Sequence, residues 1–287
     1  MEYQNPKPTE GINYSQEHPL KEFVILIIGV AVIVVVVIFT LNAIAGRFAS
    51  HIPFDFEKKM VAQFELSIVE QSPQQKYLQD LADRLTPHMD LPEQMAITVH
   101  YDDSDTVNAF ATLGGNLIFF RGLIDKMKSE NELAAVMGHE IAHIKYRHPI
   151  VALGKGLTLA SFAAFVTGAS GSVAGEWLIG SSANLSMMKF SREQESASDA
   201  ASAQMLQRYY GNIGGVKELF KTFSEIEGDR PDQAEAIGNT KMVEMFRSHP
   251  FSEDRWSSIH DLAKQKDWQF WGKQRALQFP GESIPPK

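Results

Sequence analysis

An uncharged apolar run of 23 residues, Phe23 to Ala45, constrains the fold of this 287-residue chain more than any other feature (FVILIIGVAVIVVVVIFTLNAIA). As a helix it would be about 35 Å long, enough to cross a hydrocarbon core of about 30 Å. Apolar residues cover every side of such a helix, whereas a helix at the surface of a globular core needs only one apolar face. We predict one transmembrane helix at residues 23–45, behind a polar N-terminal tail of residues 1–22.

The alternatives for this run are a cleavable signal peptide and a buried core helix. A signal peptide is disfavoured by the length of the run, by the polar residues before it and by the lack of a clear small-residue cleavage site. The flanking charges do not decide the orientation in the membrane, because they are few on both sides. Lys7 and Lys21 precede the run, and Arg47, Lys58 and Lys59 follow it.

Composition limits the function of the remaining chain. Hydrophobic residues make up 44% and charged residues 22%, as in ordinary globular proteins. The net charge of −8 argues against a nucleic-acid partner, because phosphate recognition needs a basic face. The absence of cysteine excludes disulfides, thiolate zinc sites and cysteine nucleophiles. A transition metal would therefore bind to histidine and carboxylate side chains.

Past the membrane helix, hydrophobic periodicity predicts one domain of helices and strands over residues 46–267, followed by a C-terminal tail of residues 268–287. The expected elements are helices at 56–69 and 73–85, a strand at 95–100, and a bent strand or hairpin over 107–120 that turns at Gly114 and Gly115.

The stretch GHEIAH, residues 138–143, contains the frame HExxH within a predicted helix. Ser129 followed by Glu132 has the spacing of a capping box, which marks the start of a helix. Apolar residues at helical spacing follow, and Pro149 is expected to stop the helix.

His139 and His143 lie four residues apart and therefore on one face of this helix, where both imidazoles can reach one metal ion. Glu140 lies about 100° around the helix axis from His139, a position from which it can act on a water molecule at the metal as a general base. The alternative is a helix that carries two ordinary histidines, which predicts no further ligand downstream.

A metal site of this kind needs a third protein ligand. The extended form HExxHxxGxxH is excluded, because Tyr146 and Pro149 stand where its glycine and histidine would be. The segment SREQESASD, residues 191–199, offers Glu195 as the third ligand. Asp199, one helical turn later, is expected to accept a hydrogen bond from the free N–H of a ligand imidazole. Taken alone, this charged segment would be read as a solvated helix face.

Four blocks of the chain resemble the M48 family of zinc metallopeptidases, which includes the CAAX prenyl proteases, the HtpX-like proteases and the Oma1-like proteases. They cover about half of the chain and appear in the family's order. The blocks are NAF with GGNLIFFRGLID (108–110 and 114–125), GHEIAHIKYRH (138–148), SREQESASD (191–199) and SHPFSEDR (248–255). The third differs from the family's SRxxExxAD only in Ser198, which stands in place of alanine.

The resemblance implies an α+β fold, a mainly helical, zincin-like domain of the gluzincin type with a small β-sheet, preceded by the transmembrane helix. It also implies cleavage of peptide bonds with one zinc ion (Zn2+) per chain. The residues implied are His139, His143 and Glu195 as metal ligands and Glu140 as the base.

The late HP segment contributes a further expectation. On the resemblance, His249 is a candidate donor to the oxyanion that develops during hydrolysis. The alternative is a histidine at a helix start before Pro250. Arg255, which ends this segment, is as compatible with a structural ion pair as with a role in the reaction.

Two further segments leave alternatives open. An exposed strand edge would hold an extended substrate, and either Asn108–Ala111 or Gly115–Phe119 is a candidate for it. Residues 150–179 are rich in alanine and glycine and predict a core helix with a flexible loop. The alternatives for this stretch are a hairpin partly inserted in the membrane and a loop over the cleft, in which Trp177 would contact lipid or substrate.

The favoured function is a membrane-anchored metalloendopeptidase whose partners are the lipid bilayer and unfolded, misfolded or membrane-associated polypeptides. The alternative is a zinc-stabilised chaperone or adaptor that does not cleave. Glu140 favours the enzyme, because a binding protein gains nothing from a carboxylate beside a metal-bound water. We expect a single-pass protein of the bacterial inner membrane with its catalytic domain in the periplasm. The opposite orientation, with a cytoplasmic domain, is the alternative, and the oligomeric state is left open.

Overall fold

The computed structural model describes residues 19–61, 72–156, 190–228, 245, 249–250 and 252–280. These residues are mainly helical and contain one three-stranded sheet, as the sequence predicts. The helices are α1 Pro19–Ala49, α2 Phe54–Val61, α3 Pro73–Leu85, α4 Arg121–Ile124, α5 Glu130–Lys145, α9 Arg192–Tyr210, α10 Gly214–Gly228 and α12 Glu253–Gln265. The strands are β1 Thr98–Asp102, β2 Ala109–Ala111 and β3 Asn116–Phe120, and short 3-10 turns lie at η1 Thr86–His88 and η2 Leu113–Gly115.

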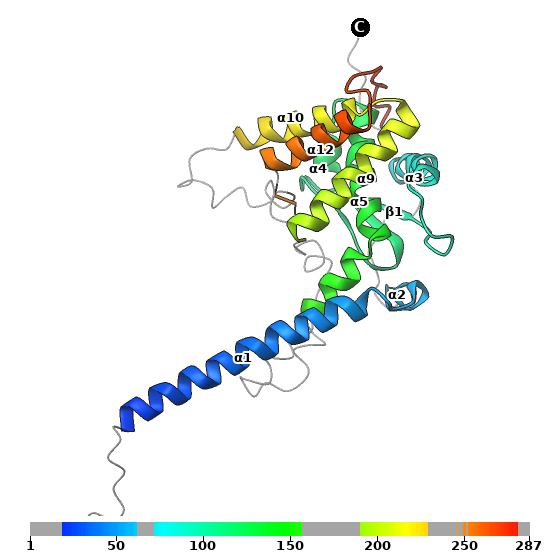
Figure 1. Cartoon of the computed structure of the whole chain (residues 1–287). Coiled ribbons are helices and arrows are strands. Elements are labelled where there is room, and N and C mark those ends of the chain that lie inside the picture. Colours follow the sequence, from blue (N-terminus) through cyan, green and yellow to red (C-terminus); the bar gives the residue numbers. More distant parts are fainter. Residues whose placement is uncertain are drawn as a thin grey trace, which may run out of the picture.

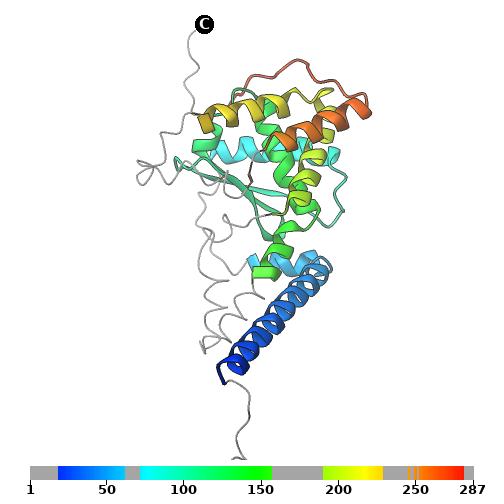
Figure 2. The same cartoon turned by 60° about the vertical axis from the view of Figure 1, so that its left-hand side comes forward.

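Helix α1 contains the predicted span and extends away from the other elements (Figure 1). Its segment Leu20–Ala49 is long and apolar enough to cross a membrane, by length and composition. None of its most apolar window is buried, so α1 is not the core helix that was one alternative. Helices α10 and α12 lie at the opposite end of the molecule from α1 (Figure 2).

The sheet has the strand order β1-β3-β2, with β1 parallel and β2 antiparallel to β3. Strands β2 and β3 form a hairpin, one of the two predicted alternatives. It turns at Gly114 and Gly115 with φ of 69° and 87°, a region that glycine adopts without strain. Strand β1 starts at Thr98 and not at residue 95 as predicted, because its pairing with β3 begins with Thr98 and Asn116. Since β3 is the central strand, the edge candidate Gly115–Phe119 is wrong and Asn108–Ala111 lies at an edge.

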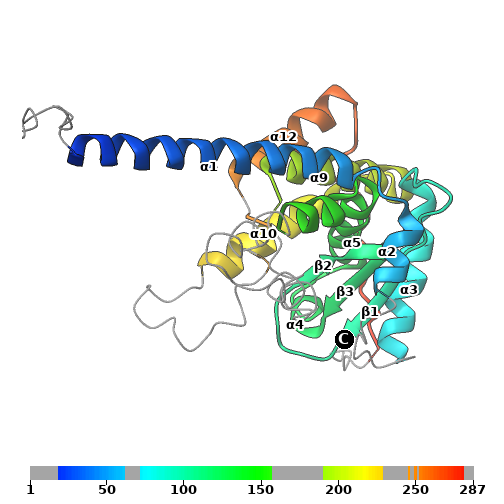
Figure 3. The same cartoon turned by 90° about the horizontal axis from the view of Figure 1, so that it is seen from below.

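Helices α3 and α5 pack against the sheet, and α9 packs along α5 (Figure 3). Apolar side chains from the strands and these helices form one continuous core. Its fully buried members include Leu78, Leu81, Leu85, Leu117, Phe119, Leu133, Met137, Ile141 and Met205.

Both ends of α5 differ in detail from the prediction. Ser129 caps the helix and accepts a hydrogen bond from the backbone N–H of Glu132. The Glu132 carboxylate accepts a hydrogen bond from the backbone N–H of Lys128 and not from that of Ser129, so only half of the capping box forms. Helix α5 ends at Lys145, before the predicted stop at Pro149. A second helix then runs over residues 148–156. Pro149 lies in its first turn, where the missing N–H of proline needs no partner.

The close approach of α5 and α9 depends on Gly138, the residue before His139. A Cβ atom at Gly138 would collide with Cε of Met205 and lie 3.0 Å from Oγ of Ser202. Ser202 also donates a 2.7 Å hydrogen bond to the carbonyl of Ala135 in α5. Glycine at this position therefore lets the two helices lie close together.

The juxtamembrane helix α2 is fixed to the rest of the domain through the buried Glu57. One oxygen of Glu57 accepts a 2.9 Å hydrogen bond from the backbone of Gly114, and the other lies 2.5 Å from Nη2 of Arg147. Arg147 also donates to the carbonyl of Ile52. A small apolar cluster lies beside this group: Ala49, Leu113, Ile150 and Leu153. The predicted helix end at 62–69 and residues 157–179, with Trp177, lie outside the described residues.

Part of the predicted C-terminal tail packs against the domain. The backbone N–H of Trp268 donates to the carbonyl of Ala263, and the backbone N–H of Arg275 donates to Oδ1 of Asn131 in α5. Phe279 is buried, with its ring centroid 5.7 Å from that of Tyr77. The packed domain thus extends past the boundary predicted at residue 267.

Candidate metal centre

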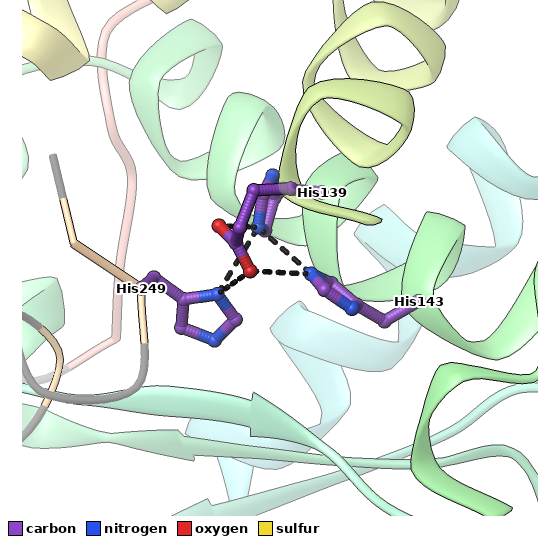
Figure 4. A group of neighbouring side chains, drawn as sticks. His139, His143 and His249 are labelled. Carbon is purple, nitrogen blue, oxygen red and sulfur yellow. Dashed lines mark hydrogen bonds and ion pairs between the residues drawn. The ribbon is translucent and has the colours of Figure 1, made fainter. Parts of the chain in front are cut away.

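Four buried side chains from three parts of the chain meet in one place (Figure 4). Helix α5 supplies His139 and His143, α9 supplies Glu195, and the segment before α12 supplies His249. One nitrogen or oxygen atom from each lies within 4.8 Å of the others. The structure therefore brings together the three predicted ligands and one residue predicted for another role.

The distances within the group suit a metal ion. The Nε2 atoms of His139 and His143 are 3.0 Å apart. Nε2 of His139 lies 3.5 Å from Oε2 of Glu195, and Nε2 of His143 lies 3.5 Å from Oε1. Ligand atoms of a tetrahedral zinc site, with bonds of 2.0 to 2.1 Å, lie about 3.3 Å apart. Neutral imidazole nitrogens and a carboxylate are also the donor types that zinc prefers in a protein without cysteine.

His249 faces this group with Nδ1 and faces Glu140 with Nε2. Its Nδ1 lies 2.9 Å from Oε1 of Glu195 and 3.3 Å from Nε2 of His139. Its Nε2 lies 3.6 Å from Oε1 of Glu140 and has no hydrogen-bond partner among the described residues. The geometry thus provides His249 with two possible contacts, one to a metal and one to a reacting group beside Glu140.

Asp199 lies behind His139, in the position predicted for it. Its Oδ1 is 2.9 Å from Nδ1 of His139, the ring nitrogen that points away from the ligand group. Burial lowers the pKa of His139, but the carboxylates of Asp199 and Glu195 outweigh this effect and raise it to about 10. A more basic imidazole is a stronger metal ligand.

Arg255 holds both carboxylates of α9. Its guanidinium binds Asp199 through Nε and Nη2, each at 2.7 Å, and its Nη1 lies 2.9 Å from Oε2 of Glu195. Burial raises the pKa of Asp199, but the hydrogen bonds from Arg255 and His139 give a net lowering. The structure therefore shows Arg255 in a structural ion pair, which was one of the roles considered for it from the sequence.

Glu140 is fully buried, and one oxygen of its carboxylate is held in place. Oε2 accepts a 2.8 Å hydrogen bond from the N–H of Ala111 in strand β2. Oε1 has no hydrogen-bond partner among the described residues. Burial is the main reason that the pKa of Glu140 is raised. A carboxylate with one free oxygen and a raised pKa suits a group that accepts and releases a proton.

His148 also belongs to the site, although no role was predicted for it from the sequence. Its Nδ1 lies 3.0 Å from Nδ1 of His143. Burial lowers the pKa of His148 to about 4. The available signal was the third histidine of GHEIAHIKYRH, but helical spacing alone does not place residue 148 beside residue 143.

Comparison with known proteins shows which family the chain belongs to. The model of a family described as peptidase family M48 matches residues 72–263, more than half of the chain. The chain is 28% identical to the beta-barrel assembly-enhancing protease of Escherichia coli (strain K12) over 208 residues, which cover 66% of this chain and 39% of that protein. It is 31% identical to metalloprotease LoiP of the same organism over 160 residues, which cover 54% of this chain and 58% of that protein.

A shorter match links the chain to a eukaryotic protein. It is 41% identical to the mitochondrial metalloendopeptidase OMA1 of Arabidopsis thaliana over 54 residues, 19% of this chain and 11% of that protein. In each of these comparisons the chain spans less than two thirds of the relative's length.

Proposed function

Because the chain belongs to peptidase family M48, we propose that it is a zinc metalloendopeptidase anchored in a membrane by α1. Its proposed substrates are unfolded, misfolded or membrane-associated polypeptides, in protein quality control or processing. The observation that carries this proposal is the buried group of His139, His143 and Glu195 beside Glu140, a carboxylate with one oxygen that accepts no hydrogen bond from the described residues.

The proposed ligands of one zinc ion are His139, His143 and Glu195, whose donor atoms converge at distances suited to it. Zinc bound there would polarise the carbonyl of the substrate and make a water molecule more acidic. Asp199 would orient His139 through the hydrogen bond at Nδ1, and Arg255 would hold Asp199 and Glu195 in place.

Glu140 would transfer the proton. The hydrogen bond from Ala111 holds Oε2, so Oε1 is the oxygen that would take a proton from the attacking water. Water oxygen then bonds to the carbonyl carbon of the scissile peptide. Glu140 returns the proton to the nitrogen of the leaving amine as the C–N bond breaks. A raised pKa favours both transfers, because it brings the carboxylate closer to the pH at which it must act.

Strand β2 is the proposed binding edge for an extended substrate. Ala111 directs its N–H away from β3 to Glu140, and residues alternate along a strand, so Ala109 directs its backbone groups to the same side. A substrate strand added at this side would lie next to Glu140. Both alanines are buried, so the substrate would have to displace the residues that cover them.

Two roles are proposed for His249, and zinc binding separates them. If Nδ1 is a fourth ligand, His249→Ala should weaken zinc binding as strongly as substitution of His143, and that result would contradict the proposed hydrolysis, because no position would remain for water. If Nε2 is a donor to the oxyanion, the candidate role that the family resemblance implies, His249→Ala should keep zinc and lower the rate of cleavage by about 10²–10³-fold.

For membrane anchoring we propose α1 as a single span, with the catalytic domain in the periplasm of a bacterium. The length and apolar surface of α1 and its lack of buried residues support the span. Addition of protease to spheroplasts tests the orientation. A periplasmic domain is digested in intact spheroplasts, whereas digestion only after lysis would show the opposite orientation.

Substitution of Glu140 tests the enzymatic function against a non-cleaving zinc protein. Glu140→Gln should retain one zinc per chain and lose cleavage of casein, an unfolded substrate, by about 10²–10⁴-fold. Glu193→Gln, the same change at an exposed position of α9, is the matched control and should keep full activity. His139→Ala should lose the metal as well. Equal rates of casein cleavage by wild type and Glu140→Gln would rule out the proposed mechanism.

A further inference from the structure

Each histidine of the HExxH frame has a partner at the ring nitrogen that faces away from the ligand group. For His139 this partner is the carboxylate of Asp199 at 2.9 Å. For His143 it is another imidazole, because Nδ1 of His148 lies 3.0 Å from Nδ1 of His143. The distance is that of a hydrogen bond between ring nitrogens.

The chemistry of the contact defines which nitrogen carries the proton. Nε2 of His143 faces His139 and Glu195, so as a metal ligand it must be free of a proton. Its neutral ring then carries the proton on Nδ1, which becomes the donor. Nδ1 of His148 must be the acceptor, since two N–H groups cannot share one hydrogen bond.

The backbone explains how His148 reaches this position. Helix α5 ends at Lys145, and Arg147 adopts a left-handed conformation with φ of 62°. This turn interrupts the helix, and the next one starts at His148. The imidazole of His148 therefore lies against that of His143, with ring centroids 4.9 Å apart. Both side chains are buried.

We propose that His148 is a positioning residue of the metal centre: Nδ1 of His148 accepts the hydrogen bond from Nδ1–H of His143 and holds Nε2 of His143 toward the ion. The inference rests on the proposed function, because it takes His143 as a metal ligand. It also means that the two imidazole ligands have different kinds of hydrogen-bond partner. His139 is supported by a charged carboxylate, and His143 is supported by a neutral ring.

Three substitutions in the full-length chain, purified in detergent, test the role of His148. His148→Phe keeps an aromatic ring of similar size and removes the acceptor. His148→Asn places an amide oxygen where Nδ1 was, whereas the longer His148→Gln places its amide at the position of Nε2. The measurement is the dissociation constant for zinc from competition with a chelator, together with the thermal unfolding midpoint of the metal-free proteins.

We expect zinc binding of His148→Phe and His148→Gln to be weaker by about 10–100-fold, the usual cost of losing such a partner. His148→Asn should bind zinc within about 3-fold of wild type, because the acceptor is restored in place. Metal-free midpoints that agree among the three variants would separate this effect from a general loss of stability. If His148→Phe fails to fold, the Asn and Gln variants still provide the comparison, since both carry an amide.

Unchanged zinc affinity in His148→Phe, or equal affinities of the Asn and Gln variants, would overturn the inference. The proposed function is tested separately in the same experiment by wild type and His139→Ala. If wild type binds zinc, His139→Ala does not, and His148→Phe matches wild type, only the role of His148 is lost. If wild type takes up no zinc, the proposed function and the inference are both wrong.

Discussion

The backbone N–H of Ala111 donates a 2.8 Å hydrogen bond to Oε2 of Glu140, and this bond joins the edge strand β2 to helix α5. It leaves the second oxygen of Glu140 without a hydrogen-bond partner in the described part of the chain. The proposed substrate edge and the proposed general base are therefore directly bonded to each other. A shift of β2 along α5 would break the hydrogen bond between them.

Gly138→Ala should destabilise the protein and weaken zinc binding. The added methyl group collides with Cε of Met205 and lies 3.0 Å from Oγ of Ser202, so these two buried side chains of α9, the helix that carries Glu195, must shift. We expect a loss of about 1–3 kcal/mol in the free energy of unfolding, as for other overpacked cores. Urea denaturation measures it. Gly29→Ala in α1 is the control, because nothing lies within 4 Å of a Cβ atom there. Equal losses in the two variants would contradict the role of Gly138.

Arg255→Leu should lower the free energy of unfolding by about 3–5 kcal/mol, because it leaves Asp199 and Glu195 buried without their counter-ion. Arg208→Leu is the matched control. Arg208 pairs with Asp90, and both side chains of that pair are exposed. An exposed pair contributes about 0–1 kcal/mol. Similar losses measured for the two variants in urea would show that Arg255 is not a buried counter-ion.

The pair of Glu57 and Arg147 should couple the juxtamembrane helix to the end of α5. Both side chains are largely buried, so removal of either partner should lower the free energy of unfolding by about 3–5 kcal/mol. The double variant Glu57→Gln with Arg147→Met should lose less free energy of unfolding than the two single variants added together, by about 0.5–3 kcal/mol. A double-mutant cycle measures this difference. Additive losses would show that the two residues act independently.

Glu130→Gln should lower stability more at neutral pH than in acid. Glu130 in α5 accepts hydrogen bonds from Tyr210 at 2.9 Å and Arg84 at 3.2 Å. Burial raises its pKa, but the bonds from Arg84 and Tyr210 outweigh burial and lower it below 4.5. The folded state thus binds fewer protons than the unfolded chain. The stability from Glu130 is complete above pH 4.5 and is lost as the pH falls through the lowered pKa.

The expected loss at pH 7 is about 1–3 kcal/mol, typical of hydrogen bonds to a buried charged group. Urea denaturation of wild type and Glu130→Gln at pH 7 and at successively lower pH measures the difference. Glu225→Gln is the control, because Glu225 pairs with Lys128 and both are exposed. A difference that stays constant or grows toward acid pH would contradict the assigned pKa shift of Glu130.

Patterns among residues close together in the sequence predicted much of the fold. Helix α3 has the predicted bounds of residues 73–85, the hairpin turns at its two glycines, and α5 begins after Ser129. The resemblance to family M48 is confirmed by the family match. These features depend on hydrogen bonds and side-chain spacing within a few residues, which the order of amino acids specifies directly.

Contacts between distant segments were harder to predict. Glu195 and Asp199 were found as candidates because their spacing places them on one helical face, but the ion pairs of Arg255 with both carboxylates follow from the packing of α12 on α9. The position of Nδ1 of His249 among the ligand atoms likewise depends on where the segment before α12 lies.

The sequence by itself determined the apolar helix, the HExxH frame and the downstream carboxylates, because each is a local pattern of spacing. Tertiary structure decided that β2 and not β3 is an edge strand, that Ala111 binds Glu140, and that His148 lies against His143. The last of these needs the left-handed turn at Arg147, which breaks the helical period. Once that period is broken, spacing along the chain no longer says which side chains meet.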